Sequence, residues 1–183
     1  RVGARYLTSA TGMTMHDIKA NPDKARDKYN LVKNNIFIKD ASSRDMAWVE
    51  SVCKSYKPDI VVLDMGDKFA RTSGFARADE ALKANAIHAR QIAKMHECAI
   101  FYMSQLSAEA EGKMYLNQAM MEGSRTGKAA EADLMVLIAK DAVKNPDNEE
   151  ESPARHLNVV KNKLSGWHGV EHCELDYLTA RYL

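Results

Sequence analysis

The sequence predicts an α/β protein of three layers, in which a mainly parallel central sheet carries added antiparallel strands at one edge. Two observations predict it. Helical and strand-like segments alternate through the first half of the chain, and strand-like segments dominate the second half. Several strand-like segments are unbroken apolar runs, which are typical of parallel strands buried on both faces.

Composition bounds the class of protein. The 183 residues are 45% hydrophobic and 28% charged, which suits one globular domain spanning residues 1–183. A net charge of +1 excludes a uniformly basic coat for nucleic acid. Three widely spaced cysteines predict no disulfide framework and favour a reducing, cytoplasmic location. No apolar run approaches the ~20 residues of a membrane span, so we expect no membrane association.

The stretch 59–65 is the most informative part of the first half. It follows a Lys57-Pro58 break and runs through four apolar residues to Asp64. We predict a strand buried on both faces, with Asp64 at its carboxyl end, where open α/β sheets place their ligands. A carboxylate there suits Mg²⁺ beside a nucleotide phosphate. A helix-capping or turn aspartate is the alternative.

The remaining elements follow from capping residues and periodicity. Asn21-Pro22 predicts a helix start, because asparagine caps helices and proline suits the first turn. Ser42 or Ser43 is expected to cap a helix that buries one apolar stripe, formed by Met46, Val49, Cys53 and Tyr56. Further predicted helices cover 1–13, 22–33 and 78–96, and predicted strands cover 36–38, 99–103, 134–138 and 156–160, with an extended tail at 170–177.

Polar residues follow three of these strands, namely Asp64, Gln105 and the pair Lys161 and Lys163. We expect all three strand ends to line one edge of a single sheet. A metal-binding acid, an amide that senses a phosphate and cations for developing negative charge form a set suited to phosphoryl transfer. Taken singly, Gln105 also fits a plain turn, and the lysines also fit a solvated surface.

Four segments in this order resemble the RecA-type ATPase domain of DnaB-like replicative helicases, which phage primase-helicases share. They are IVVLD (60–64), YMSQL (102–106), EGSRTGKAAEADLMVLIAKD (122–141) and HLNVVKNKLSGWHG (156–169). The resemblance covers nearly the whole chain. It implies a RecA-like fold, ATP and Mg²⁺ as cofactors, single-stranded DNA as partner, a hexameric ring, a primase as a further partner, and the cytoplasm of a bacterial or phage-infected cell.

The resemblance also implies residue roles. Asp64 matches the Walker B aspartate, which holds Mg²⁺, and Gln105 matches the residue that couples the γ-phosphate to the DNA loops. Lys161 and Lys163 match a pair that reaches the neighbouring subunit's nucleotide. Lys140 and Tyr177 lie near the adenine clamp of the family. The candidate DNA contacts are Arg71, Arg77, Lys113, Arg125 and Lys128. A solvated crossover loop fits Arg71 and Arg77 equally well, and subunit contacts are the alternative for Arg125 and Lys128.

The sequence departs from the family in two places. Lys163 stands where an arginine is usual, and its KNK context is similar to RecA recombinases. No GxxxxGK[ST] loop is present. The segment 122–129 resembles one, but Glu122 occupies the position of the first glycine and Ala129 the position of the serine or threonine. We therefore expect a domain that lacks its N-terminal P-loop portion, is inactive alone and self-associates through exposed apolar sheet surface. The alternatives are a RecA-like recombinase or loader, and a non-catalytic RecA-fold interaction module.

Overall fold

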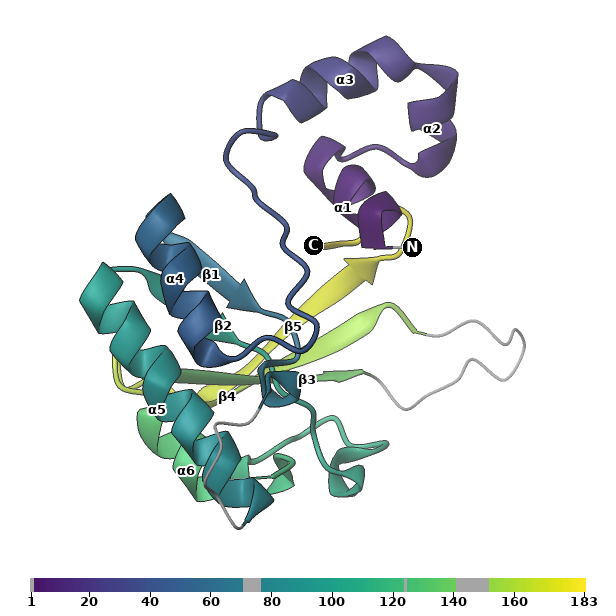
Figure 1. Cartoon of the computed structure of the whole chain (residues 1–183). Coiled ribbons are helices and arrows are strands. Elements are labelled where there is room, and N and C mark those ends of the chain that lie inside the picture. The colour runs from purple at the N-terminus through teal and green to yellow at the C-terminus, as the bar shows by residue number, and fades with distance from the viewer. Residues whose placement is uncertain (1, 71–76, 124, 141–151) are drawn as a thin grey trace.

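The computed structural model describes residues 2–70, 77–123, 125–140 and 152–183, and the strands in these ranges form two sheets (Figure 1). In the first sheet β1 (Ile60–Leu63) and β2 (Ala99–Tyr102) run parallel. The helix α5 (Ala78–His96) lies between them in the chain and supplies the crossover that a parallel pair requires. The second sheet is antiparallel in the order β3 (Leu134–Lys140), β4 (Ala154–Asn162), β5 (Gly169–Asp176) and β6 (Arg181–Tyr182).

This arrangement confirms the α/β class but does not confirm a mainly parallel central sheet. The strands that were expected as an addition at the edge form the larger sheet in the described part of the chain. The reason is connectivity: β4, β5 and β6 follow one another without an intervening helix, and such connections favour antiparallel neighbours.

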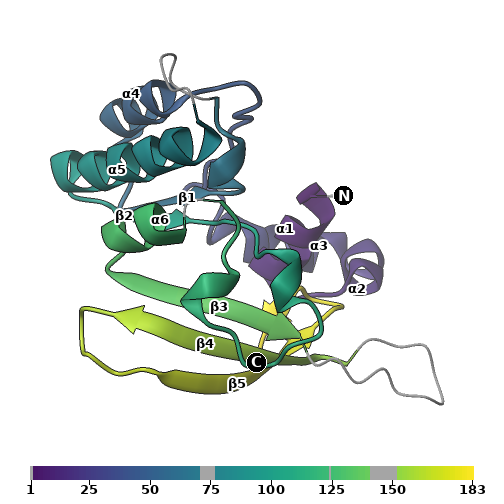
Figure 2. The same cartoon turned by 90° about the horizontal axis from the view of Figure 1, so that it is seen from below.

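The helix α4 (Met46–Tyr56) packs with α5 against one side of β1 and β2, as Figure 2 shows. Its buried face carries Met46, Val49 and Cys53, which confirms the predicted stripe except at Tyr56, whose side chain is 46% exposed. The predicted cap was wrong. The Asp45 carboxylate, and neither Ser42 nor Ser43, accepts a hydrogen bond from the Trp48 amide at 2.9 Å.

The prediction that β1 is buried on both faces was also wrong. Ile60 and Val62 are 60% and 59% exposed, and Phe101 on β2 is 57% exposed. Only the face toward α4 and α5 is covered. Leu63 belongs to the buried hydrophobic cluster that includes Val49 of α4 and Ile92 of α5, whereas Ile60 and Val62 do not. The unbroken apolar run 60–63 therefore forms a strand whose alternate side chains are exposed to solvent.

The N-terminal region forms three helices, α1 (Val2–Thr11), α2 (Met15–Ala20) and α3 (Pro22–Asn30), which contact one another. Thr14 and Asp17 form a capping box at the start of α2, a helix that the sequence patterns did not predict.

The segment 36–38 is not a strand, and its three apolar side chains are exposed. In the described part of the chain, no helix is long and apolar enough to cross a membrane.

The molecule exposes more surface than its mass requires. Its accessible area is 12,400 Å², whereas a compact monomer of 20.5 kDa exposes about 8,800 Å². Alternate residues of β3 add to the exposed apolar area, because Leu134, Val136 and Ile138 are 41–46% exposed. Edge strands with exposed apolar side chains are templates for association.

We therefore expect the isolated chain to self-associate at micromolar concentration in sedimentation velocity. The variant Val62→Lys should shift the distribution toward monomer, because a charged side chain on an edge strand opposes pairing. Leu31→Lys is the matched control, since Leu31 is 79% exposed but lies outside both sheets. A monodisperse wild-type monomer would contradict the expectation.

Candidate functional site

Asp64 and Gln105 lie beyond the carboxyl ends of the two parallel strands. Leu63 and Tyr102 are register partners, so the residues that follow each strand emerge at the same edge. Both Asp64 and Gln105 are exposed. The Gln105 carbonyl accepts a hydrogen bond from the Glu122 amide at 3.2 Å, which joins this strand end to the segment before α6 (Arg125–Glu131).

The backbone after Asp64 turns sharply. Met65 adopts the left-handed conformation with φ 56°, which is costly for a residue with a side chain. Gly66 then begins the short helix η1 (Gly66–Lys68), and its amide donates to the Met103 carbonyl at 2.8 Å. A Cβ at Gly66 would lie 2.6 Å from the Tyr102 ring, so only glycine allows this close approach.

A largely buried polar cluster supports this turn. We call it the Asp67 cluster, and it comprises Asp67, Tyr102, Ser104 and Lys128. The Lys128 ammonium contacts the Asp67 carboxylate at 2.9 Å and the Ser104 hydroxyl at 2.7 Å. The Asp67 carboxylate also accepts from the Ser104 hydroxyl and, at 3.3 Å, from the Tyr102 hydroxyl. Burial and the negative Asp67 raise the pKa of Tyr102 above its usual value.

The Asp67 cluster changes the interpretation of Lys128. Its side chain is 4% exposed and its ammonium is paired with Asp67, so the predicted contact with DNA is wrong in this arrangement. The physical reason is that a buried cation needs a partner inside the protein. Arg77 is exposed and paired with Asp79 at 2.9 Å. Arg71 and the Arg125 side chain lie outside the described residues.

Lys161 and Lys163 lie elsewhere. Because β4 is antiparallel to β3, its carboxyl end lies beside the amino end of β3, and β3 points the same way as β1 (Figure 1). The lysines therefore do not share an edge with Asp64 and Gln105, and that prediction was wrong. Both ammonium groups instead donate to carbonyls at the C-terminal end of α6, those of Ala129 and Ala130.

Arg90 of α5 organises the surroundings of these lysines. Its guanidinium binds the Asp133 carboxylate at 2.9 Å and donates to the Glu131 carbonyl. The Arg90 hydrogen bond holds the pKa of Asp133 below its usual range, and Asp133 also faces Lys163 at 3.7 Å. Desolvation and then repulsion by Lys163 lower the pKa of Lys161. Half-exposed Lys163 is the cation of this group most open to solvent.

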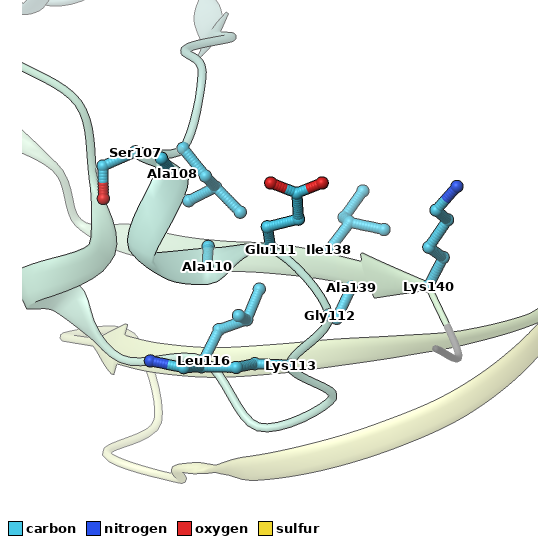
Figure 3. A pocket seen from close by; sticks show the side chains of 11 residues that line it. Ser107, Ala108, Ala110, Glu111, Gly112, Lys113, Leu116, Ile138, Ala139 and Lys140 are labelled. Atoms are coloured by element: carbon cyan, nitrogen blue, oxygen red, sulfur yellow. The ribbon is translucent and has the colours of Figure 1, made fainter. Parts of the chain in front are cut away.

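Lys113 and Lys140 line one shallow pocket of about 350 Å³ (Figure 3). Its wall includes Leu106, the residue after Gln105, and its other side is the end of β3. The structure thus brings a predicted DNA contact and a predicted adenine contact to the same place. Tyr177 is separate from the pocket lining, and its hydroxyl accepts from Arg155 at 2.7 Å and donates to the Ser152 carbonyl at 3.1 Å.

Of the two aspartates in this turn, Asp64 is the one whose carboxylate could hold Mg²⁺. It is exposed, whereas the Asp67 carboxylate already contacts Lys128. In the described part of the chain no three acidic, histidine or cysteine side chains gather into a metal cluster. One carboxylate is nevertheless a sufficient protein contribution where Mg²⁺ takes its other ligands from phosphates and water.

Among the comparisons with known proteins, the search of solved structures identifies the fold. No protein-family model matches the chain, and no curated protein matches it. Among solved structures, 98% of the chain superposes on a DnaB-like replicative helicase that was studied with its interactions with primase, with a TM-score of 0.77 and 16% identity. It also superposes over 98% of its length on a second solved structure, described as an ATPase domain, with a TM-score of 0.79 and 18% identity. The chain has the fold of a DnaB-like ATPase domain.

The chain spans less than half of the first of these proteins, 46% of its length, and 68% of the second. Within this fold, Asp64 and Gln105 both lie beyond the carboxyl ends of β1 and β2. This agreement is in the fold, since both identities lie below 20%.

Sequence reasoning missed four residues that surround the predicted site residues. Asp67 and Ser104 each lie within three residues of a predicted site residue, and that proximity was an available signal. Arg90 and Arg155 had none, because each reaches its partners from the middle of a helix or the start of a strand. Arg155 lies opposite Lys140 in the register and contacts Tyr177, so it joins the two predicted adenine contacts.

Proposed function

We propose that this chain is part of an ATP-dependent replicative DNA helicase motor, which couples ATP hydrolysis to translocation on single-stranded DNA and to duplex unwinding. The observation that carries the proposal is the position of Asp64 and Gln105. They follow adjacent parallel strands at one edge of a fold that matches DnaB-like ATPase domains over 98% of the chain. Open α/β sheets bind ligands at that edge.

Each residue has a role in this proposal. Asp64 holds Mg²⁺, which when bound neutralises charge on the β- and γ-phosphates of ATP. Gln105 senses the γ-phosphate, and its backbone bond to Glu122 connects it to the following loop. Lys163, which is 47% exposed, reaches the nucleotide of a neighbouring subunit, while the Lys161 ammonium donates to the Ala129 carbonyl of α6. Lys140 and Tyr177, with Arg155 between them, face the adenine.

The assembly in the proposal is a hexameric ring around single-stranded DNA, with nucleotides at the subunit interfaces. These 183 residues contain no GxxxxGK[ST] loop, so the residues named here form only part of the proposed nucleotide site. Arg71, Arg77, Lys113 and Arg125 contact the DNA backbone, and Lys128 does not. A primase is a proposed partner, because the DnaB-like helicase to which the chain is similar was described with one.

The first test is Mg²⁺-dependent ATP hydrolysis by the assembled protein that contains this chain. Asp64→Ala should lower kcat at least about a hundredfold, because it removes a group that positions charge at the reacting phosphate. Asp59→Ala is the matched control, since Asp59 is also exposed but precedes β1. Equal rates for the two variants would contradict the proposed role of Asp64.

The same experiment tests the interface. Neither Asp64→Ala nor Lys163→Ala rings should hydrolyse ATP, but mixing the two subunits should restore activity. In a mixed ring, some interfaces pair an intact Asp64 with an intact Lys163 from the neighbour. No recovery on mixing would show that Lys163 does not act across subunits.

A further inference from the structure

We propose that Lys128 is a positioning residue that holds the turn after Asp64 and the strand end at Gln105 in one geometry. Through it, a displacement of α6 moves both site residues together. The inference deepens the proposed function and rests on it, because it assigns a mechanical role within the proposed ATP site. Neither the sequence motifs nor the fold comparison assigns this role to Lys128.

The geometry of the ammonium carries the proposal. A lysine has three donors, and Lys128 uses them on three segments that are distant in the chain. They reach the Asp67 carboxylate at 2.9 Å, the Ser104 hydroxyl at 2.7 Å and the Glu122 carbonyl at 2.5 Å. With the side chain 4% exposed, water cannot replace a lost partner without opening the structure. The three segments are therefore held together by one buried charge.

Each partner is close to a site residue. Asp67 lies three residues after Asp64 within the turn that contains η1, and Ser104 is bonded directly to Gln105. The Glu122 amide donates to the Gln105 carbonyl, while the Gly66 amide donates to Met103 beside Ser104. A movement of α6 that displaces Lys128 would therefore also displace Asp67 and Ser104, which lie three residues and one residue from Asp64 and Gln105.

The loop before α6 gives this link a function in the proposed motor. Residues 107–118, which include the predicted DNA contact Lys113, lead into Glu122 and then into α6. The Ser107 amide donates to the Met120 carbonyl at 2.8 Å, so the loop closes on itself before it reaches the Asp67 cluster. DNA that moves this loop would act on α6, and Lys128 would carry the movement to Asp64 and Gln105.

Amide hydrogen exchange on the purified chain separates positioning from general stabilisation. We compare wild type, Lys128→Met and the milder Ser104→Ala, with Lys83→Met as the control for loss of an exposed lysine. The amides of Gly66 and Glu122 should exchange about tenfold faster in both test variants, because local opening then precedes global unfolding. The Lys57 amide, bonded to the Cys53 carbonyl at the end of α4, is the reference, and in Ser104→Ala its exchange should change less than about twofold.

Equal acceleration at all amides would overturn the proposal, because Lys128 would then only stabilise the fold. No acceleration at Gly66 or Glu122 would overturn it as well. If Lys128→Met does not fold, Ser104→Ala alone decides, since it removes one partner and keeps the ion pair.

A second measurement keeps this inference separate from the proposed function. In the assembled protein, Ser104→Ala should reduce the stimulation of ATP hydrolysis by single-stranded DNA more than it reduces the basal rate. A wild type that never hydrolyses ATP would refute the proposed function, while the exchange data would still decide whether Lys128 couples the segments. Unchanged stimulation by DNA would overturn the coupling role even where hydrolysis is present.

Discussion

Replacing Lys128 by methionine is expected to destabilise the folded chain by about 3–5 kcal/mol, because it leaves the largely buried Asp67 carboxylate without its cation. The Asp67 side chain is 16% exposed, so water can compensate only in part. Hydroxyl donors from Ser104 and Tyr102 remain but carry no charge. Urea unfolding monitored by circular dichroism measures the change, and an unaltered denaturant slope would show that the transition stays comparable.

A double variant sharpens this result. Asp67→Leu combined with Lys128→Met should recover most of the lost stability, since replacing both members of a buried pair by apolar groups is often neutral. Lys83→Met should change stability by no more than about 0.5 kcal/mol, as exposed substitutions usually do. If Lys128→Met behaved like this control, the pair would contribute little. Additive losses in the double variant would mean that Asp67 and Lys128 act independently.

Asn158→Ala is expected to destabilise the chain by about 2–4 kcal/mol, because it leaves more than one buried polar group without a partner. Asn158 is 3% exposed. Its amide oxygen accepts from the Leu116 amide at 2.9 Å, and its amide nitrogen donates to the Met114 carbonyl at 3.0 Å. These two bonds fasten the loop 106–121 to β4. Thermal unfolding and chemical unfolding both report the change.

The second effect of Asn158→Ala is local. The Leu116 amide should lose its protection from hydrogen exchange, and the pocket wall formed by Leu116 and Lys113 should become mobile. Asn35→Ala is the control, because Asn35 is exposed in the segment after α3. A stability loss without altered exchange at Leu116 would place the effect of Asn158 in the sheet, where its amide nitrogen also donates to the Leu137 carbonyl at 3.4 Å.

Elements that are specified by their own local sequence were predicted correctly, and elements that depend on tertiary contacts were not. The bounds of α5 were predicted to the residue, because a long amphipathic helix is specified by its own periodicity. The segment 36–38 failed because strand formation needs a partner edge as well as a suitable composition. The helix α6 was not predicted, because Gly127 and Thr126 have low helix propensity. Its stability depends on tertiary hydrogen bonds that Lys128 and Lys161 donate.

The same distinction applies to the site. Asp64 and Gln105 were predictable because each closely follows a strand, and strand direction alone places them at a common edge. Lys161 and Lys163 also lie at a strand end, but that strand runs antiparallel, and the sequence does not state its direction. The burial of Lys128 was unpredictable for a different reason: its partners Asp67 and Ser104 are 61 and 24 residues away in the chain.

The exposed apolar side chains of β1, β2 and β3 also have a thermodynamic consequence. The heat capacity of unfolding comes mainly from apolar surface that becomes hydrated, at about 12–15 cal/mol/K per residue in ordinary domains. In this chain the native state already hydrates residues such as Ile60, Val62 and Phe101. The heat capacity increment should therefore lie below that range, which flattens the curve of stability against temperature and weakens the tendency to unfold in the cold.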